Sequence, residues 1–103
     1  MSSGNPPKSK RVALVTGGTR GIGLGISQKL AESGFNLAVN GRREEADIAE
    51  TLNDLRAMGT DVLYCRADIS MADDRQSMIS QIKERFGRLD VLVNNAGLGM
   101  RVI

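Results

Sequence analysis

A glycine-rich segment near the start of the chain has the residue types and spacing that bind phosphate groups. It reads Thr-Gly-Gly-Thr-Arg-Gly-Ile-Gly over residues 16–23 and places Gly17, Gly21 and Gly23 between a predicted strand and a predicted helix. The first glycine permits a tight turn, the second lets a pyrophosphate approach the backbone, and the third allows the helix to pack closely. The helix N-terminus supplies free N–H groups and a positive dipole. The segment therefore predicts a dinucleotide site.

Other phosphate-binding loops fit this segment less well. A Walker-type loop requires a lysine after its last glycine, whereas this chain has Leu24 there, which argues against a nucleotide kinase or an ATPase. The Gly-x-x-x-Gly-x-Gly spacing also differs from the commoner Gly-x-Gly-x-x-Gly fingerprint. A glycine-rich connection with no ligand is the remaining alternative.

The stretch after the second predicted strand bears on the choice between NAD and NADP. Sites that select NAD usually hold the ribose hydroxyls with an acid about twenty residues beyond the glycines. Here that stretch is Asn40-Gly41-Arg42-Arg43, and no acid precedes Glu44. A carboxylate would repel a 2′-phosphate, whereas a guanidinium binds it in a bidentate way. Arg42 is therefore predicted to bind the 2′-phosphate of NADP, with Arg43 as a weaker candidate; a surface solubility role is the alternative for both.

The predicted elements bring these segments to one edge of a sheet. Nearly continuous apolar runs, typical of strands buried on both faces, cover residues 11–16, 36–40, 61–67 and 89–94. Helical spacing of apolar residues lies between them, at Ile22, Ile26 and Leu30, at Ile48, Leu52 and Leu55, and at Met78, Ile82 and Phe86. Crossovers of this length require parallel pairing, so we predict an α/β fold, the first β-α-β-α-β-α-β portion of a Rossmann-type doubly wound parallel sheet. The candidate residues follow the carboxyl ends of its strands, where such sheets bind ligands.

The sequence also marks the ends of the predicted helices. Gly34, Gly59 and Gly87 each follow the last apolar residue of a helix, which predicts left-handed C-terminal caps. Ser70 followed by Asp73 predicts a capping arrangement at the start of the third helix.

The glycine turn, together with Asn-Asn-Ala-Gly at residues 94–97, resembles the classical short-chain dehydrogenase/reductase family over residues 12–98. The turn is similar to that of 3-oxoacyl-acyl-carrier-protein reductases, but reductases of sugars, steroids and other ketones share it. The resemblance implies hydride transfer between NADP and a small-molecule carbonyl or alcohol, with NAD the less favoured cofactor. It also implies a homo-oligomer, either a dimer or a tetramer.

The resemblance assigns roles to further residues. Asn94, Ala96 and Gly97 match a motif that steadies the sheet and lines the adenosine side of the site. Asp68 is expected to accept a hydrogen bond from the adenine amino group, or else to be a solvated carboxylate or helix cap, while the Ile69 backbone meets the ring. Arg20 is similar to a second basic residue of members that prefer NADP. The predicted cofactor-binding residues are Gly17, Thr19, Arg20, Gly21, Ile22, Gly23, Arg42, Asp68, Ile69, Asn94, Ala96 and Gly97.

The catalytic residues that the resemblance implies cannot be placed in this sequence. The family uses a Tyr with a Lys four residues later, a Ser upstream and an Asn on a preceding helix, but the only tyrosine, Tyr64, lies in a predicted strand. The chain has no histidine, and its lone Cys65 is expected to be a core residue, so no metal site or other nucleophile is predicted. We therefore expect residues 11–103 to be an NAD(P)-binding domain, truncated before its catalytic half, whose partner is the remainder of the same enzyme. A non-catalytic dinucleotide-binding module and a non-binding scaffold are the alternatives.

The composition is typical of one soluble domain, with 103 residues, 41% hydrophobic and 25% charged. A net charge of +2 is too small to indicate a nucleic-acid or membrane partner. A single cysteine favours a reducing compartment, so a cytoplasmic location is expected. Residues 1–10 are rich in Ser, Gly, Pro and Lys without an apolar run, and are predicted to be a flexible arm.

Overall fold

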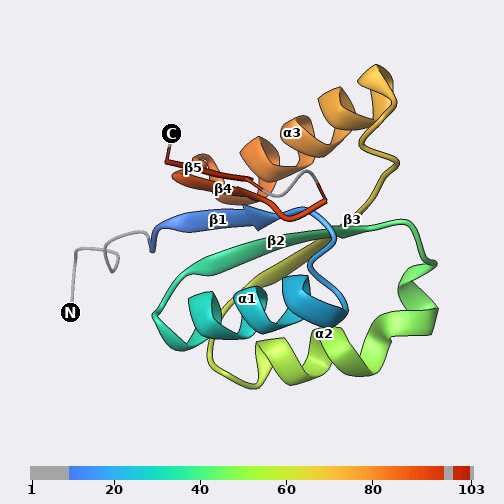
Figure 1. Ribbon diagram of the computed structural model, residues 1–103. Coiled ribbons are helices and arrows are strands. Elements are labelled where there is room, and N and C mark those ends of the chain that lie inside the picture. Colours follow the sequence, from blue (N-terminus) through green and yellow to red (C-terminus); the bar gives the residue numbers. More distant parts are fainter. Residues whose placement is uncertain (1–9, 97–98, 103) are drawn as a thin grey trace.

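The computed structural model describes residues 10–96 and 99–102. Helices and strands alternate along most of the chain (Figure 1). Their bounds are β1 (Val12–Val15), α1 (Gly21–Glu32), β2 (Asn36–Gly41), the 3₁₀ helix η1 (Glu45–Ile48), α2 (Ala49–Arg56), β3 (Val62–Arg66), α3 (Ala72–Phe86), β4 (Val91–Asn94) and β5 (Gly99–Val102). The predicted strands and helices are thus present, and the strand ends lie within two residues of their predicted positions.

Within the described residues the strands form one sheet in the order β3-β2-β1-β4-β5. The pairs β1–β2, β1–β4 and β2–β3 are parallel, which confirms the predicted Rossmann-type α/β class. The structure adds a strand that the sequence did not predict, β5, which pairs with β4 in the antiparallel sense. Only residues 95–98 separate the two strands, and so short a connection can form a hairpin but not a parallel crossover.

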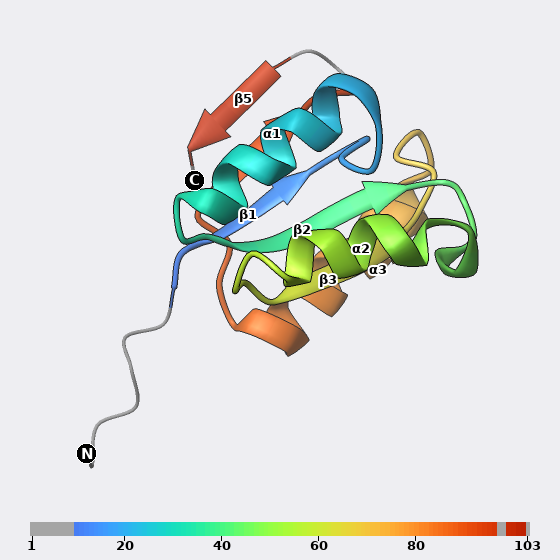
Figure 2. The same cartoon turned by 90° about the horizontal axis from the view of Figure 1, so that it is seen from below.

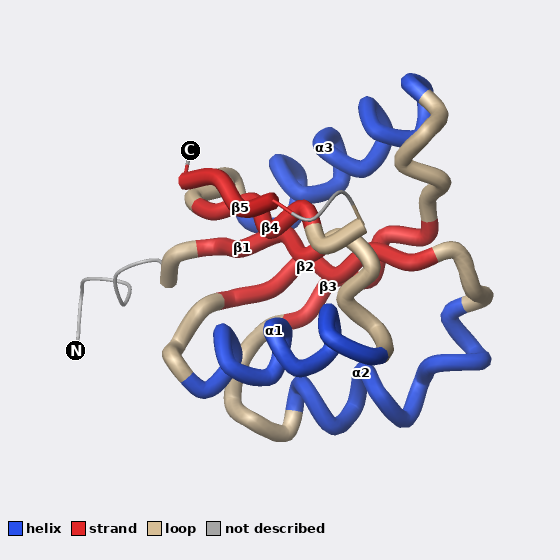
Figure 3. Tube along the Cα trace, viewed as in Figure 1, coloured by secondary structure: helices blue, strands red, loops and turns tan. Residues whose placement is uncertain are grey.

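Helices cover both faces of the sheet. Figures 1 and 2 show α1 and α2 on one face and α3 on the other, and the tube in Figure 3 shows the strands running between these two layers. Successive residues of β1 alternate between two cores: Ala13 and Val15 pack on the α1 and α2 side, whereas Val12 and Leu14 pack on the α3 side. Both faces of the strand are therefore buried, which explains its continuous apolar run.

The predicted apolar stripe of α1 holds in part, because Ile26 and Leu30 are half-buried and pack against the core. Ile22 is 78% exposed, and the buried residues of this helix are Gly23, Ser27 and Ala31. Small side chains at these positions let the helix approach the sheet and the glycine turn more closely than the larger Ile side chains would. The stripes predicted for the other helices hold better: Ile48 of η1 and Leu52 and Leu55 of α2 are buried, as are Met78 and Ile82 of α3, while Phe86 is half-buried.

The predicted glycine helix ends are confirmed, since Gly34, Gly59 and Gly87 all have positive φ angles just beyond their helices. The predicted cap at the start of α3 is wrong, because the N-cap residue is Met71 and no side chain caps the helix. The Ser70 hydroxyl instead donates to Oδ1 of Asp68 at 2.7 Å. This side chain is therefore bonded within the loop before the helix, and α3 begins at Ala72 without a side-chain cap.

No helix in the part of the chain that the structure describes combines the length and apolar character needed to cross a bilayer.

Candidate functional site

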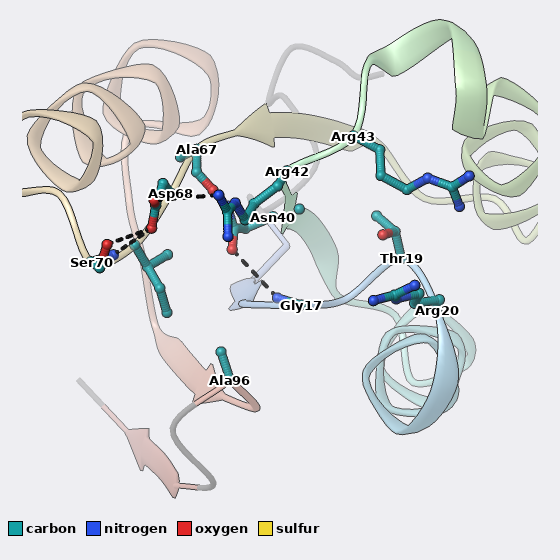
Figure 4. Close-up of a pocket in the computed structure, with 12 residues that line it drawn as sticks. Gly17, Thr19, Arg20, Asn40, Arg42, Arg43, Ala67, Asp68, Ser70 and Ala96 are labelled. Atoms are coloured by element: carbon teal, nitrogen blue, oxygen red, sulfur yellow. Dashed lines mark hydrogen bonds and ion pairs between the residues drawn. The ribbon is translucent and has the colours of Figure 1, made fainter.

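A pocket of about 650 Å³ opens at the edge of the sheet where β1, β2, β3 and β4 end (Figure 4). Its walls come from four segments that are far apart in the sequence. The residues that line it are Gly17, Thr19, Arg20, Asn40, Gly41, Arg42, Arg43, Ala67, Asp68, Ile69, Ser70 and Ala96. Its volume lies within the range of about 300–1,000 Å³ typical of small-molecule sites.

The turn between β1 and α1 depends on glycine at two positions. Gly17 has a φ of +62°, which is a left-handed conformation that residues with a Cβ rarely adopt. A Cβ at Gly23 would lie 1.9 Å from the carbonyl oxygen of Gly17, so no larger residue fits without moving the backbone. The third glycine therefore packs against the turn itself, where the sequence predicted contact between helix and sheet.

Ser27 holds the same turn from inside the helix. Its side chain is fully buried, and its hydroxyl oxygen lies 3.0 Å from the carbonyl oxygens of both Gly18 and Gly23. Ser27 was not among the residues predicted from the sequence. Its signal was a polar side chain four residues after a turn glycine, on the helix face that must meet the sheet.

The N-terminus of α1 points its free backbone donors toward this end of the molecule. The N-cap residue, Arg20, has extended backbone angles and makes no side-chain cap, and the first helical turn contains no acidic residue. The first hydrogen bond within the helix runs from the N–H of Leu24 to the carbonyl of Arg20. The N–H groups before Leu24 thus lack a helical acceptor and can donate to an anion.

Asn40, at the end of β2, ties three strands together at the pocket floor. Its side chain is only 4% exposed, its Nδ2 donates to the carbonyl oxygens of Cys65 at 3.0 Å and Ala67 at 3.1 Å, and its Oδ1 accepts from the N–H of Gly17 at 3.4 Å. The N–H of Gly18 also donates to the Asn40 carbonyl at 3.0 Å. Asn40 was not predicted from the sequence to be a site residue, although a polar residue inside an apolar strand was the available signal.

Three guanidinium groups and one carboxylate line the described pocket. Arg42 lies near Asp68, whereas Arg20 and Arg43 lie on the Thr19 side (Figure 4). Hydrogen bonds from the hydroxyl and N–H of Ser70, with the Arg42 guanidinium nearby, lower the pKa of Asp68, so this carboxyl is ionised at neutral pH. The pocket therefore has a net positive lining.

Arg42 and Asp68 form a long ion pair, with 3.7 Å between the guanidinium nitrogen and Oδ2. The Arg42 side chain is 78% exposed. An exposed ion pair of this kind contributes little to stability, so Arg42 can exchange Asp68 for another anion at little cost.

The turn after β4 meets the glycine turn from the other side. Asn95 Nδ2 donates to the carbonyl of Gly17 at 3.3 Å, and the N–H of Ala96 donates to the Thr16 hydroxyl at 3.3 Å. The same hydroxyl lies 3.2 Å from Oδ1 of Asn94. Asn94 thus helps to hold the end of β1 beside the end of β4, while Ala96 lines the pocket.

The structure brings most of the predicted site residues to this one pocket. Those that line it are Gly17, Thr19, Arg20, Arg42, Asp68, Ile69 and Ala96. Gly21 and Gly23 lie in the first turn of α1, and Asn94 is the last residue of β4, next to the pocket; the exposed Ile22 side chain does not line it. Gly97 lies outside the described residues. Gly41, Ala67 and Ser70 line the pocket without having been predicted.

The two residues that the sequence placed in the core behave as expected. Tyr64 and Cys65 are buried in β3, and burial raises the pKa of the Cys65 thiol to about 11. No cluster of three or more His, Cys, Asp or Glu side chains suited to a metal ion occurs among the residues that the structure describes.

A parallel sheet with helices on both faces, whose first strand leads through a glycine turn into the first helix at the pocket, defines a Rossmann-type nucleotide-binding fold. The chain belongs to the short chain dehydrogenase family, whose sequence model matches residues 11–103.

Several known proteins resemble the chain in both sequence and fold. It is 44% identical over 93 residues to the 3-oxoacyl-acyl-carrier-protein reductase FabG of Staphylococcus aureus, covering 88% of this chain and 37% of that protein. The 3-oxoacyl-acyl-carrier-protein reductase from Brucella melitensis, solved in complex with NAD, matches with a TM-score of 0.79 and 38% identity over 85% of this chain and 34% of that one. The actinorhodin polyketide ketoreductase, solved with NADPH, matches with a TM-score of 0.77 and 38% identity over 84% and 33%. The chain thus spans about a third of the length of these relatives.

Proposed function

We propose that this chain is the cofactor-binding segment of an NADP-dependent oxidoreductase, which reduces a carbonyl or oxidises an alcohol by hydride transfer. The observation that carries the proposal is the pocket at the end of β2, which has Arg20, Arg42 and Arg43 in its lining and no acid at the β2 terminus. The bound nicotinamide cofactor would supply the hydride, and the residues of this chain would bind and orient the cofactor.

The glycine turn fits the pyrophosphate of such a cofactor. The N–H groups at the start of α1 lack helical acceptors, and the absence of a Cβ at Gly21 leaves the backbone open, since nothing lies within 4 Å of where that Cβ would be. A phosphate placed there would be stabilised by the donors and by the helix dipole. Ser27 and Asn40 hold the turn in place before any ligand binds, so little ordering entropy would be lost on binding.

The arginines fit the 2′-phosphate that distinguishes NADP from NAD. Arg42 would leave its long pair with Asp68 and bind the phosphate, with Arg43 and Arg20 across the pocket adding positive charge. A carboxylate at the end of β2 would instead favour the ribose hydroxyls of NAD. Asp68 and the Ile69 backbone lie beyond Arg42, where we place the adenine.

The chemistry and setting of the whole protein are part of the same proposal. The catalytic Tyr and Lys of the family are absent from this sequence, so we place them in a remaining part of the same enzyme that completes the site. Relatives named as ketoacyl or polyketide reductases support a small-molecule carbonyl substrate. The family resemblance supports a homo-oligomer, and the single cysteine supports a cytoplasmic location.

The direct test is calorimetric titration of the intact natural protein with NADPH and with NADH in parallel. The proposal expects NADPH to bind more tightly, with an advantage that decreases as salt screens the phosphate contact. Tighter binding of NADH would reject the role of the arginines, and no binding of either cofactor would reject the dinucleotide site. NADPH binding without turnover of any carbonyl compound would favour a non-catalytic binding module.

A further inference from the structure

The backbone that carries Arg42 and Arg43 is held by two side chains of the neighbouring strand. The Tyr64 hydroxyl donates to the carbonyl oxygen of Arg43 at 2.6 Å, and Nε of Arg66 donates to the carbonyl oxygen of Arg42 at 3.1 Å. Tyr64 and Arg66 are two residues apart on β3, so both project from the same face of the sheet. Two consecutive carbonyls of the arginine segment are therefore fixed from one side.

These contacts begin where the strand pairing stops. The last register pair between β2 and β3 joins Gly41 to Arg66, and the last backbone hydrogen bond runs from the N–H of Ala67 to the carbonyl of Gly41 at 2.9 Å. η1 begins only at Glu45. The segment from Arg42 to Glu44 thus lies outside both elements and depends on the β3 side chains for its position.

The absence of a side chain at Gly41 lets Tyr64 reach this segment. A Cβ at Gly41 would lie 3.1 Å from the Tyr64 hydroxyl oxygen and 3.1 Å from Oγ1 of Thr19, which is tighter than ordinary contact. Tyr64 itself is only 6% exposed. Burial also raises its pKa, so the hydroxyl stays protonated and remains a donor over the ordinary pH range.

Arg66 has a second contact that affects the charge of the pocket edge. Its guanidinium lies 2.9 Å from Oε1 of Glu44, the first acid after the two arginines. Glu44 does not line the pocket. The pair neutralises a carboxylate that is adjacent to Arg43 in the sequence and would otherwise repel a phosphate bound by Arg42 or Arg43.

We infer that Tyr64 and Arg66 are positioning residues for cofactor selection, which hold the arginine segment against the pocket and keep Glu44 paired away from the 2′-phosphate. This inference rests on the proposed function, because it presumes that the arginines bind that phosphate. Neither residue lines the pocket; both act through the backbone of Arg42 and Arg43, and Arg66 also acts through the charge of Glu44.

The test compares the dissociation constants of NADPH and NADH for variants of the intact natural protein. Tyr64→Phe removes only a hydroxyl, and Arg66→Gln changes an exposed side chain, so both proteins should fold. Each should weaken NADPH about fivefold, the effect of losing one hydrogen bond or ion pair, while NADH changes by less than about twofold. Thr60→Val and Arg85→Gln are matched controls, because they remove a hydroxyl bond to the Phe35 carbonyl and an ion pair with Asp61 beyond the opposite end of β3. These controls should leave the ratio of the two constants unchanged.

A second substitution separates the two contributions of Arg66. Glu44→Gln in the Arg66→Gln background should recover part of the NADPH affinity, because it removes the carboxylate that Arg66 no longer neutralises. Arg66→Lys should retain most of the NADPH affinity if the charge of Arg66 has the larger effect. It should lose most of that affinity if the hydrogen bond to the Arg42 carbonyl has the larger effect. Recovery or retention specific to NADPH supports the inference, since a general structural role would change both cofactors alike.

The outcomes distinguish failure of the inference from failure of the proposed function. If the unmodified protein prefers NADPH and neither Tyr64→Phe nor Arg66→Gln changes the ratio, the inference is wrong and the proposed function stands. The inference is also wrong if both variants weaken NADPH and NADH equally. If the unmodified protein shows no preference for NADPH, the proposed cofactor choice is wrong and this inference fails with it.

Discussion

Replacement of Arg42 by aspartate is the most direct perturbation of the proposed cofactor choice. The Arg42 side chain is 78% exposed, so its charge acts through a medium close to water. Unit charges about 4 Å apart in water interact by about 1 kcal/mol, and Arg42→Asp both removes an attraction and adds a repulsion. We therefore expect NADPH binding to weaken by about 2 kcal/mol, or about 30-fold in Kd. NADH lacks the 2′-phosphate, and an acid there can hold its ribose hydroxyls, so its affinity should stay constant or increase.

The assay is calorimetric titration of Arg42→Asp and the unmodified protein with both cofactors at low and high salt. Arg85→Asp is the matched control, since it makes the same charge change in an arginine that also pairs with an aspartate, Asp61, outside the pocket. The control should alter the NADPH affinity by less than about twofold. The difference between Arg42→Asp and the unmodified protein should shrink as salt increases. An equal loss of NADPH and NADH affinity, or no loss of either, would refute the role given to Arg42.

Three further predictions concern the turn, the pocket floor and the effect of pH. Gly23→Ala should lower the melting temperature and abolish NADPH binding, because its Cβ would lie 1.9 Å from the Gly17 carbonyl oxygen; an unchanged melting curve and titration would contradict this. Asn40→Leu should reduce the free energy of unfolding in urea by about 1–3 kcal/mol, since buried polar groups lose their partners; a change below about 0.5 kcal/mol would count against that role. The hydrogen bond from Arg85 lowers the pKa of Asp61 below its ordinary value of 3.8. The stabilisation that this bond gives is therefore fully present at pH values above 3.8 and is lost as the pH falls through the lowered pKa. The melting temperature of Asp61→Asn should therefore lie below that of the unmodified protein at pH 7 and converge with it in acid; a constant gap would rule this out.

Much of the candidate site was predictable because its residues lie at strand ends. Once β1, β2 and β3 are identified from their apolar runs, parallel pairing places Gly17, Arg42 and Asp68 at one edge of the sheet. Local backbone chemistry also predicted the left-handed helix ends, such as Gly87 with a φ of +73°. These features depend on short stretches of sequence and on general rules of sheet topology.

Other features depended on contacts between segments far apart in the sequence. The Asn40 side chain binds backbone groups of the glycine turn and of β3, up to 27 residues away, and no local pattern specifies those partners. The cap predicted from Ser70 is absent, since the Ser70 side chain bonds to Asp68 and the N-cap residue of α3 is Met71. The antiparallel β5 was missed because its residues, Gly-Met-Arg-Val, do not form the continuous apolar run by which the other strands were identified.

The sequence by itself determined the α/β class, the family resemblance and the positive charge around the predicted cofactor site. Apolar periodicity, glycine positions and residue charge are properties of the chain before it folds, and each follows from local physical chemistry. Only the tertiary structure decided which side chains hold the arginine segment and the glycine turn. Tyr64, Arg66, Ser27 and Asn40 act through hydrogen bonds to distant backbone atoms, and the lengths of those bonds depend on how the strands and helices pack together.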